Sequence, residues 1–520
     1  MRLLRLKLLS EFRGLNKGFE IIFDDDTIQE QKLEPICFVG LNGSGKSNIL
    51  EVISEIFYYL ENFVKGVKQN NNSFGFEISY TLSKQAYQMN SNKPIESDLE
   101  VLITKKINQN PIVNGKKGKE KVKDVLPTQI VGYSSGMNEL ISNPYIKMDF
   151  QYLDEFDKLI GEDATGDALS LNRMFFMDYD LNKLITVCNF LFDEDKNLAP
   201  LTKEIKIESL HSFSISLQLR KENKKPIDLP SRLEVTIEKL KQCSTLYHEK
   251  KKKTSKGKYK EYIFSFWVND STKEAVKKNF GTAFELFKDL YFLRLLNNHL
   301  IGSKTQKQIR EGDINTNISA LLPKHEEIKK IFNISDIAFR KEGLKEPIYY
   351  KQLSDGEHQL LHVVGMMLLV NREGTLFLLD EPETHFNPDW RSKFVSILNE
   401  CVQNENDIRE QEVVLTTHSP FIVSDCKKEK VFIFNKKNGY VEEPKNPDFQ
   451  TYGTAIEMIY WHIFGKHETI AKLAFDELKE IEKKVKSDKL TKDETMKELS
   501  KYGDSFEKMN IVRLLREKYS

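Results

Sequence analysis

Apolar and polar residues follow three patterns along the chain, and each pattern predicts a different kind of element. Continuous apolar runs, as in PICFVG, TLFLLD and VVLTT, are typical of parallel strands buried on both faces. Alternation of apolar with polar residues predicts half-exposed strands, and strands are expected at 2–9, 74–83, 98–107, 128–133, 206–218 and 262–268. Helical spacing of apolar residues predicts helices, at 47–63, 171–192, 274–300, 453–464, 467–484, 491–502 and 505–517.

The first continuous run leads directly into a glycine-rich loop, VGLNGSGKSNIL, which has the spacing G-x-x-x-x-G-K-S from Gly40 to Ser47. Glycines let backbone N–H groups curl around phosphates, a lysine contacts the β- and γ-phosphates, and a hydroxyl binds Mg²⁺. Guanine recognition normally needs an N-K-x-D stretch, and NKKN at 435–438 lacks the aspartate, which favours ATP. A solvated glycine-rich turn is the alternative. The predicted nucleotide-binding residues are Asn42, Gly43, Ser44, Gly45, Lys46, Ser47 and Asn48.

Polar residues at the ends of two later strands are the expected partners of this loop. The run TLFLLD ends in Asp380 and is followed by Glu381, and VVLTT is followed by His418. Because the carboxyl ends of parallel strands meet at one edge of a sheet, these side chains are expected near Lys46. We expect Ser47 and Asp380 to bind Mg²⁺, Glu381 to orient or deprotonate the attacking water, and His418 to contact the γ-phosphate. A polar strand end and a capping histidine are the alternative.

Between the loop and these strands lies QLSDGEHQLLHVVGMMLLV, residues 352–370, which begins with a strong helix-start signal. Ser354 and Glu357 have the S-x-x-E spacing of a capping box. A helix is therefore predicted to begin at Ser354, with its positive end outward and Gly356 exposed beside the cap. Such an end suits a phosphate. The helix behind it is apolar almost all round, which predicts burial; a capped core helix without a ligand is the alternative.

In this order the motifs resemble an ABC-type ATPase head of the SMC and RecF kind, with Walker A at 40–47, the signature LSDGE and Walker B at 376–380. The resemblance implies that two heads dimerise head to tail, as a homodimer or a higher even-numbered oligomer. It also implies that Ser354, Gly356 and Glu357 of one head contact the ATP that is held by the other head's phosphate loop.

Two further segments carry the resemblance, and a third departs from it. The stretch DEPETHFNPDW at 380–390 resembles the D-loop of the overcoming-lysogenisation-defect (OLD) branch of these ATPases. Arg13 in SEFRGL resembles an N-terminal arginine that reaches the nucleotide, while a solvated charge at a strand end is an equal alternative. No glutamine follows a suitable strand as a Q-loop would require, and IVGYSSGMNEL at 130–140 takes that position.

These observations predict an α/β fold, in which an ABC ATPase head with the mixed-sheet core of P-loop NTPases is split by a large α+β insertion and followed by a helical tail. The expected parts are an N-terminal ATPase lobe at 1–140, the insertion at 141–334, a C-terminal ATPase lobe at 335–445 and a helical region at 446–520 for partner docking. The chain lacks the long heptad arrays that coiled-coil arms require.

Charge and cysteine usage limit the expected binding partners and the cellular compartment. Lys plus Arg (78) balances Asp plus Glu (78), so affinity for nucleic acid would have to come from a local patch. The five cysteines are scattered and lack C-x-x-C spacing, which predicts a protein of the reducing cytoplasm. The sequence has no run of about 18 apolar residues, so no membrane partner is expected.

Two lysine-rich stretches, 115–123 and 249–260, are predicted to be loops. They are either solvated tips or contacts for the phosphates of DNA or RNA. The neighbouring Tyr259, Tyr262 and Phe264 would either stack on bases or belong to the core.

The tail bears on the choice of activity. It lacks the D-x-D pair of a Toprim nuclease, and His462, His467 and Glu468 lack a third metal-binding partner. Its end resembles restriction-system-associated and Septu-type anti-phage ATPases, which implies a partner nuclease of the HNH type. We therefore expect an ATP-hydrolysing subunit of a bacterial anti-phage complex. The alternatives are a RecF-like DNA repair clamp and a self-sufficient nuclease of the OLD type.

Overall fold

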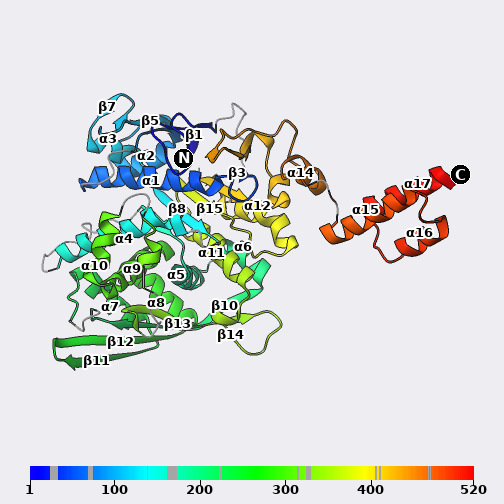
Figure 1. Ribbon diagram of the computed structural model, residues 1–520. Coiled ribbons are helices and arrows are strands. Elements are labelled where there is room, and N and C mark those ends of the chain that lie inside the picture. The colour runs from blue at the N-terminus through cyan, green and yellow to red at the C-terminus, as the bar shows by residue number, and fades with distance from the viewer. Residues whose placement is uncertain are drawn as a thin grey trace.

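The structure, a computed structural model, shows a main body with three large sheets and a small group of helices beside it (Figure 1). The described residues are 1–23, 33–67, 74–136, 139–160, 173–193, 195–221, 225–312, 316–323, 329–404, 407–408, 411–466, 468 and 470–519. In these ranges no helix has both the length and the apolar character needed to cross a membrane.

A parallel sheet of six strands lies at the centre of the body, in the order β19–β3–β18–β15–β8–β9. Its strands are β3 (Ile36–Val39), β8 (Gln129–Ser134), β9 (Met174–Phe176), β15 (Thr375–Asp380), β18 (Glu412–Thr417) and β19 (Val431–Ile433). Every residue of β3, β15 and β18 is buried, which confirms that the continuous apolar runs form strands covered on both faces. Strands from both ends of the chain thus form one sheet.

An antiparallel sheet packs on the other side of helix α1 (Lys46–Lys65), in the order β2–β1–β4–β5–β6–β7. Its strands are β1 (Arg2–Leu8), β2 (Glu20–Ile22), β4 (Phe76–Leu82), β5 (Leu99–Lys105), β6 (Ile112–Val113) and β7 (Lys116–Lys117). The rings of Phe57 and Tyr59 on α1 meet Tyr80 and Phe76 of β4, while α1 also contacts β15 and β18. The helix that begins at the phosphate loop is therefore fixed between two sheets.

Further helices pack around the two sheets. They are α2 (Lys84–Ser91), α3 (Lys119–Val125), α4 (Asn143–Lys158), α5 (Tyr179–Leu191), α6 (Asp195–Ile205), α11 (Asp355–Leu369), α12 (Pro388–Val402), α13 (Pro420–Ser424) and α14 (Ile456–His462). Helix α11 packs against α5, α6 and α12, which confirms the buried helix predicted behind the capping box.

The helix predicted over 171–192 is wrong in its first third. Met174–Phe176 pairs with β8 as the edge strand β9, and α5 begins only at Tyr179. Asp178 caps α5 by accepting a hydrogen bond of 2.8 Å from the backbone N–H of Leu181. Pairing with a buried parallel strand outweighs the helical spacing of these apolar residues.

The insertion and the residues that directly follow it build a second antiparallel sheet, in the order β11–β12–β10–β13–β14. Its elements are β10 (Ile207–Gln218), β11 (Leu246–Thr254), β12 (Gly257–Trp267), β13 (Phe332–Lys341), β14 (Ile348–Tyr349), α7 (Ser231–Cys243), α8 (Asp270–Phe280), α9 (Ala283–Leu295) and α10 (Ser303–Glu311). The helical stretch predicted at 274–300 is divided, because α8 ends at Gly281 and the side chain of Thr282 caps α9.

Both lysine-rich stretches have regular structure, so the prediction of loops is wrong. Residues 249–260 form most of the β11–β12 hairpin, and residues 115–123 form β7 and most of α3. In the hairpin at 249–260, hydrogen bonds between two polar strands hold the structure, so the apolar alternation that usually marks a strand in the sequence is missing. Tyr262 and Phe264 are 4% and 0% exposed and belong to the core, which excludes them from base stacking.

Beyond α14, three helices form a small unit of their own: α15 (Lys472–Lys486), α16 (Lys492–Leu499) and α17 (Phe506–Tyr519). Their buried residues form a cluster apart from the main core, namely Leu478, Ile481, Val485, Leu499, Ile511 and Leu515. Figure 1 shows this unit, in red, projecting from the body. Together with α14, it confirms the four helices predicted in the tail.

Two short ribbons complete the fold, β16 (Gln403–Asn404) with β17 (Asp407–Ile408), and β20 (Lys436–Lys437) with β21 (Tyr440–Val441). All five cysteines are buried and unpaired, as their spacing predicts.

Candidate nucleotide site

The phosphate loop connects β3 to α1, as predicted. Gly45 precedes the helix with φ of +99°, a left-handed conformation that favours glycine. A Cβ atom on Gly45 would lie 2.3 Å from Cγ2 of Val441, so a larger residue would not fit. The N–H of Ser44 donates to the carbonyl of Leu41 at 3.1 Å and closes the turn. The positive end of α1 therefore lies at the loop, where an anion would bind.

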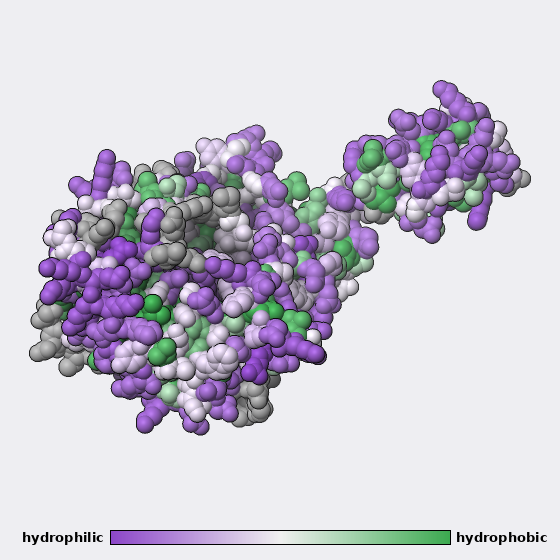
Figure 2. Space-filling view, turned by 90° about the horizontal axis from the view of Figure 1, so that it is seen from below, coloured by the Kyte–Doolittle hydropathy of each residue, from purple (hydrophilic) through white to green (hydrophobic). Residues whose placement is uncertain are grey.

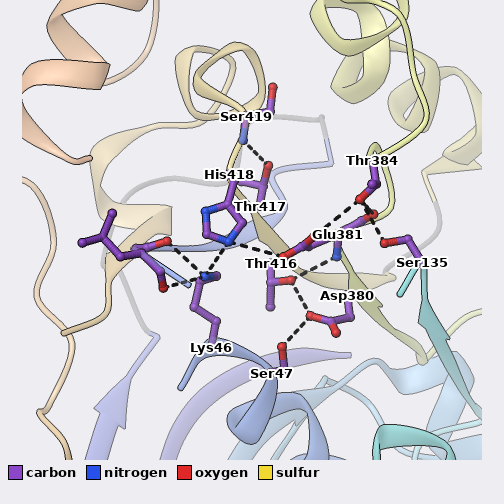
Figure 3. A network of polar contacts seen from close by, with 12 residues as sticks. Lys46, Ser47, Ser135, Asp380, Glu381, Thr384, Thr416, Thr417, His418 and Ser419 are labelled. Atoms are coloured by element: carbon purple, nitrogen blue, oxygen red, sulfur yellow. Dashed lines mark hydrogen bonds and ion pairs between the residues drawn. The ribbon is translucent and has the colours of Figure 1, made fainter. Parts of the chain in front are cut away.

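Lys46 is the first residue of α1, and its side chain contacts the loop (Figure 3). Nζ donates to the carbonyl oxygens of Gly40 at 3.0 Å and Leu41 at 3.3 Å, and lies 3.0 Å from Nε2 of His418. Lys46 is 5% exposed. This burial lowers its pKa, and the charge of Glu381 acts in the opposite direction. A buried ammonium in this position can neutralise phosphate oxygens.

Asp380, at the end of β15, accepts hydrogen bonds from three hydroxyl groups. Its Oδ1 accepts hydrogen bonds from Ser47 Oγ at 2.8 Å and Thr416 Oγ1 at 2.6 Å, and its Oδ2 accepts one from Ser134 Oγ at 3.3 Å. A set of oxygen donors with one carboxylate suits Mg²⁺, which usually keeps waters and substrate phosphates as further ligands. Ser47 and Asp380, the predicted pair, are the residues that would hold the ion.

Protein side chains alone do not build a metal centre in the described ranges. No group of three or more His, Cys, Asp or Glu residues there could hold an ion. Of the three metal-binding residues considered in the tail, His467 lies outside the described residues. The Ser47–Asp380 pair therefore fits an ion that arrives with a nucleotide.

Glu381 follows Asp380 in a strained backbone conformation. Its φ of +49° is left-handed, which costs a non-glycine residue about 1 kcal/mol or more. The N–H of Glu381 donates to Thr416 Oγ1 at 3.0 Å, which fixes this turn. Oε1 lies 3.3 Å from His418 Nε2, and the hydrogen bond from His418 lowers the pKa of Glu381. The carboxylate is therefore ionised at neutral pH and can accept a proton.

Sequence reasoning missed the hydroxyl residues of this network. Thr416 and Ser134 stand opposite Asp380 on the two strands that flank β15. Ser135 Oγ lies 2.9 Å from Thr384 Oγ1, which donates to the carbonyl of Glu381 at 3.0 Å. The segment at the predicted Q-loop position thus supplies serines where a glutamine was sought. The available signal was a polar residue at the end of each apolar strand.

A second carboxyl group of the same stretch is buried. Glu383 is 4% exposed, and the hydroxyl of Thr417 donates to its Oε1. Burial raises the pKa of Glu383 to about 7. Sequence reasoning gave this residue no role, and its geometry makes it a support for the turn after Glu381.

The signature residues lie at the start of α11, as predicted. Ser354 and Glu357 form a complete capping box, in which the N–H of Ser354 donates to Glu357 Oε2 at 2.8 Å. Ser354 is exposed, whereas Gly356 is buried, so the prediction of an exposed Gly356 is wrong. A Cβ atom on Gly356 would lie 2.8 Å from the carbonyl oxygen of His385, because the turn after Walker B folds against the helix.

The structure does not bring the signature to the phosphate loop of the same chain. Within the described ranges, the side-chain hydrogen bonds and ion pairs of Ser354 and Glu357 involve each other and Lys341. The five residues that do come together are Lys46, Ser47, Asp380, Glu381 and His418.

Arg13 connects the N-terminal segment to α1. Its Nε lies 3.0 Å from Oε1 of Glu51, and its side chain is 15% exposed, so the alternative of a solvated charge is wrong. The carbonyl of Arg13 accepts a hydrogen bond of 2.7 Å from Asn48 of the phosphate loop. Burial raises the pKa of Glu51 to about 7.

Parts of the sequence are similar to known proteins. The family model described as "AAA domain, putative AbiEii toxin, Type IV TA system" matches residues 206–424. The chain is 23% identical to Protein ea59 of Escherichia phage lambda over 160 residues, which covers 30% of this chain and 29% of that protein. It is 22% identical to the Septu protein PtuA of Bacillus thuringiensis over 221 residues, which covers 39% of this chain and 54% of PtuA. The chain thus spans about half or less of these relatives.

Solved structures of SMC heads were also matched. An SMC head bound to the C-winged helix domain of ScpA has a TM-score of 0.37 and 12% identity, over 86% of this chain and 98% of that chain. The SMC head domain from Thermotoga maritima has a TM-score of 0.32 and 12% identity, over 86% and 100%. In its site residues the chain resembles ATPases of the ABC and SMC type, and part of its sequence is similar to an AAA domain family and to a Septu protein of bacterial defence.

Proposed function

We propose that the chain hydrolyses ATP with Mg²⁺ as a head-to-tail homodimer or higher even-numbered oligomer. Its nucleotide state would control a partner nuclease of the HNH type in a bacterial anti-phage complex. The observation that carries the proposal is the network that joins the phosphate loop to residues more than 330 positions away: Ser47 to Asp380, and Lys46 to His418. A solvated turn would not need these contacts.

Each residue of the network has a role in this reaction. When ATP binds, the ammonium group of Lys46 would exchange its hydrogen bonds to the loop carbonyls for contacts with the phosphates. Ser47 and Asp380 would hold Mg²⁺, which when bound neutralises phosphate charge. Glu381 would take the proton of the attacking water, because its lowered pKa keeps the carboxylate ionised at neutral pH. His418, 3.3 Å away, would hold that carboxylate in position and contact the γ-phosphate.

The signature helix supports the pairing of two heads. Ser354 and Asp355 are exposed at the positive end of α11, and the rigid helix behind them is buried. A phosphate held by a second copy would find there the backbone N–H groups of a helix start and the hydroxyl of Ser354.

The α15–α17 unit supports docking of a partner. It has its own apolar cluster, yet Leu473, Phe506 and Met509 remain 75%, 64% and 68% exposed. Contiguous exposed apolar patches mark binding surfaces, and docking of a partner on this unit would cover these three side chains. The nuclease character of the partner comes from the resemblance to Septu-type ATPases.

The test of the reaction is Glu381→Gln, which keeps the size of the side chain but cannot take a proton. We expect ATP turnover to fall by about 10²-fold or more. We also expect ATP to hold the variant as a dimer of twice 60.6 kDa in light scattering. Glu100→Gln on the exposed side of β5 is the control and should behave as wild type. Normal turnover by Glu381→Gln would refute the role of Glu381.

The test of the composite site uses two variants that are inactive for different reasons. Asn caps helices as well as Ser, so Ser354→Asn should keep the fold but lose the hydroxyl at the phosphate. Lys46→Ala loses the phosphate contact. Mixed in equal amounts, they form dimers with one intact site, and we expect turnover well above that of either variant alone. Ser354→Thr is the control. A mixture no more active than its components would refute contact in trans.

A further inference from the structure

The β11–β12 hairpin projects from the insertion. Its strands pair from Leu246 to a two-residue turn at Ser255 and Lys256, and residues 246–253 are all exposed. Figure 1 shows the hairpin at the lower edge of the body, and Figure 2, seen from below, shows predominantly hydrophilic side chains in this region. The projecting part is thus a ribbon with both faces in solvent.

The two faces of the ribbon differ in charge. Because side chains alternate along a strand, four lysines share one face, termed the lysine face: Lys251, Lys253, Lys258 and Lys260. On the opposite face, Glu261 lies 3.4 Å from Nζ of Lys252 and accepts a hydrogen bond of 3.1 Å from Tyr259. Glu249 continues the lysine face toward the body and forms an ion pair of 3.1 Å with Lys241. In the ranges that the structure describes, no carboxylate forms an ion pair with any of the four lysines of the lysine face.

The pairing register places like charges directly opposite each other. Lys251 stands across from Lys260, and Lys253 across from Lys258. Each such pair weakens a hairpin, and no burial at these exposed positions offsets the loss. The lysine face therefore does not serve the stability of the chain, and a polyanion is the kind of partner that would neutralise it.

We propose that the lysine face binds the phosphate backbone of duplex DNA. Lysines two positions apart on a strand are about 6.8 Å apart, which equals about two base-pair steps of 3.4 Å. A two-stranded ribbon also fits a major groove of about 12 Å. Single strands are bound mainly by stacked aromatic rings, and Tyr262 and Phe264, the rings nearest on this face, are buried. Contact with phosphates predicts binding without sequence preference.

The test measures binding of a fluorescent 30-base-pair DNA by anisotropy between 50 and 300 mM salt. Four phosphate contacts predict a slope of log K against log salt concentration near roughly −3.6. Lys251→Gln with Lys253→Gln should reduce the slope by about 1.8 and weaken binding roughly tenfold or more. The matched control is Lys250→Gln with Lys252→Gln on the other face of the same strand, which should leave the slope near that of wild type.

Two outcomes would overturn the proposal: equal loss in both double variants, or no binding by the wild-type chain at 50 mM salt. The second outcome would favour an acidic protein as the partner. ATP turnover, measured without DNA, should be unchanged in both double variants. Failure of DNA binding is therefore distinguishable from failure of the proposed hydrolysis.

Discussion

The buried carboxyl group of Glu383 makes the stability of the folded protein depend on pH. Burial raises its pKa to about 7, so between pH 4.5 and 7 the folded state binds a proton that the unfolded state has released. This contribution to stability is full below pH 4.5 and is lost as the pH rises through 7. The proton-bound form is thus the one that suits the buried site.

We predict that Glu383→Gln gains stability relative to wild type as the pH rises from 5 to 8. The gain should reach about 1 to 3 kcal/mol at pH 8, because the amide cannot ionise. Thermal denaturation at several pH values measures it. The exposed Glu443, replaced by glutamine, is the control. If the difference in the free energy of unfolding between Glu383→Gln and wild type does not change with pH, the raised pKa of Glu383 is contradicted.

At the residue scale the sequence predicts the groups that belong to a motif. Lys46, Ser47, Asp380, Glu381 and His418 meet in the structure as expected. Thr416 and Ser134 were missed because their role depends on standing level with Asp380 in neighbouring strands. Register between strands that are far apart in sequence is set by the assembled sheet, and one strand's pattern does not reveal it.

At the element scale the start of α11 combines a correct prediction with a wrong one. The capping box and the helix are local properties of the sequence and follow from spacing. The burial of Gly356 is not local, since it depends on the carbonyl of His385, 29 positions along the chain. The glycine allows the turn after Walker B to pack directly against the signature helix.

We predict that Gly356→Ala destabilises the fold by about 1 to 3 kcal/mol, although alanine normally favours a helix. The added methyl group would displace the turn that holds Glu381, so ATP turnover should fall more than ATP binding. Thermal denaturation and turnover measure the two effects. Gly503→Ala, with no neighbour within 4 Å, is the control. If Gly356→Ala is more stable than wild type, the turn at His385 moves aside without cost and the prediction is wrong.

Two of the other element errors share one cause. Residues 249–260 form strands without apolar alternation, and Met174–Phe176 forms a strand within a helical pattern. In both places the hydrogen bonds of a partner strand decide the structure, and the periodicity of a single segment cannot show that partner.

At the scale of the whole molecule, the described residues form three apolar clusters: a main core, a small cluster around Phe150 and Ile309 in the body, and the cluster of the tail helices. The main core extends from Met1 to Ile463, whereas α15–α17 are held together by their own cluster. The overall α/β class, the insertion and the helical tail were predictable from pattern and motif order. The ribbon that projects from the insertion was not, because its lysine-rich strands lack the apolar alternation that marks a strand in the sequence.

We predict that removal of residues 470–520 leaves the main body with an unchanged melting temperature and ATP turnover, since no residue of the main core is lost. Calorimetry of the full chain should show a separate, weaker transition for the α15–α17 unit. Removal of 505–520 alone should abolish that transition, because Ile511 and Leu515 leave the small cluster. A single shared transition in the full chain would contradict the division.

The place of β3 in the central sheet has a consequence for synthesis on the ribosome. Ile36–Val39 emerges early, but its two neighbours are β18 and β19, which end at Thr417 and Ile433. At 5 to 20 residues per second, translation takes roughly 20 to 80 s to deliver them. During that time the apolar segment has both edges open, and open strand edges pair with other chains. Nascent chains should therefore depend on chaperones, and a truncated message should yield an aggregating product.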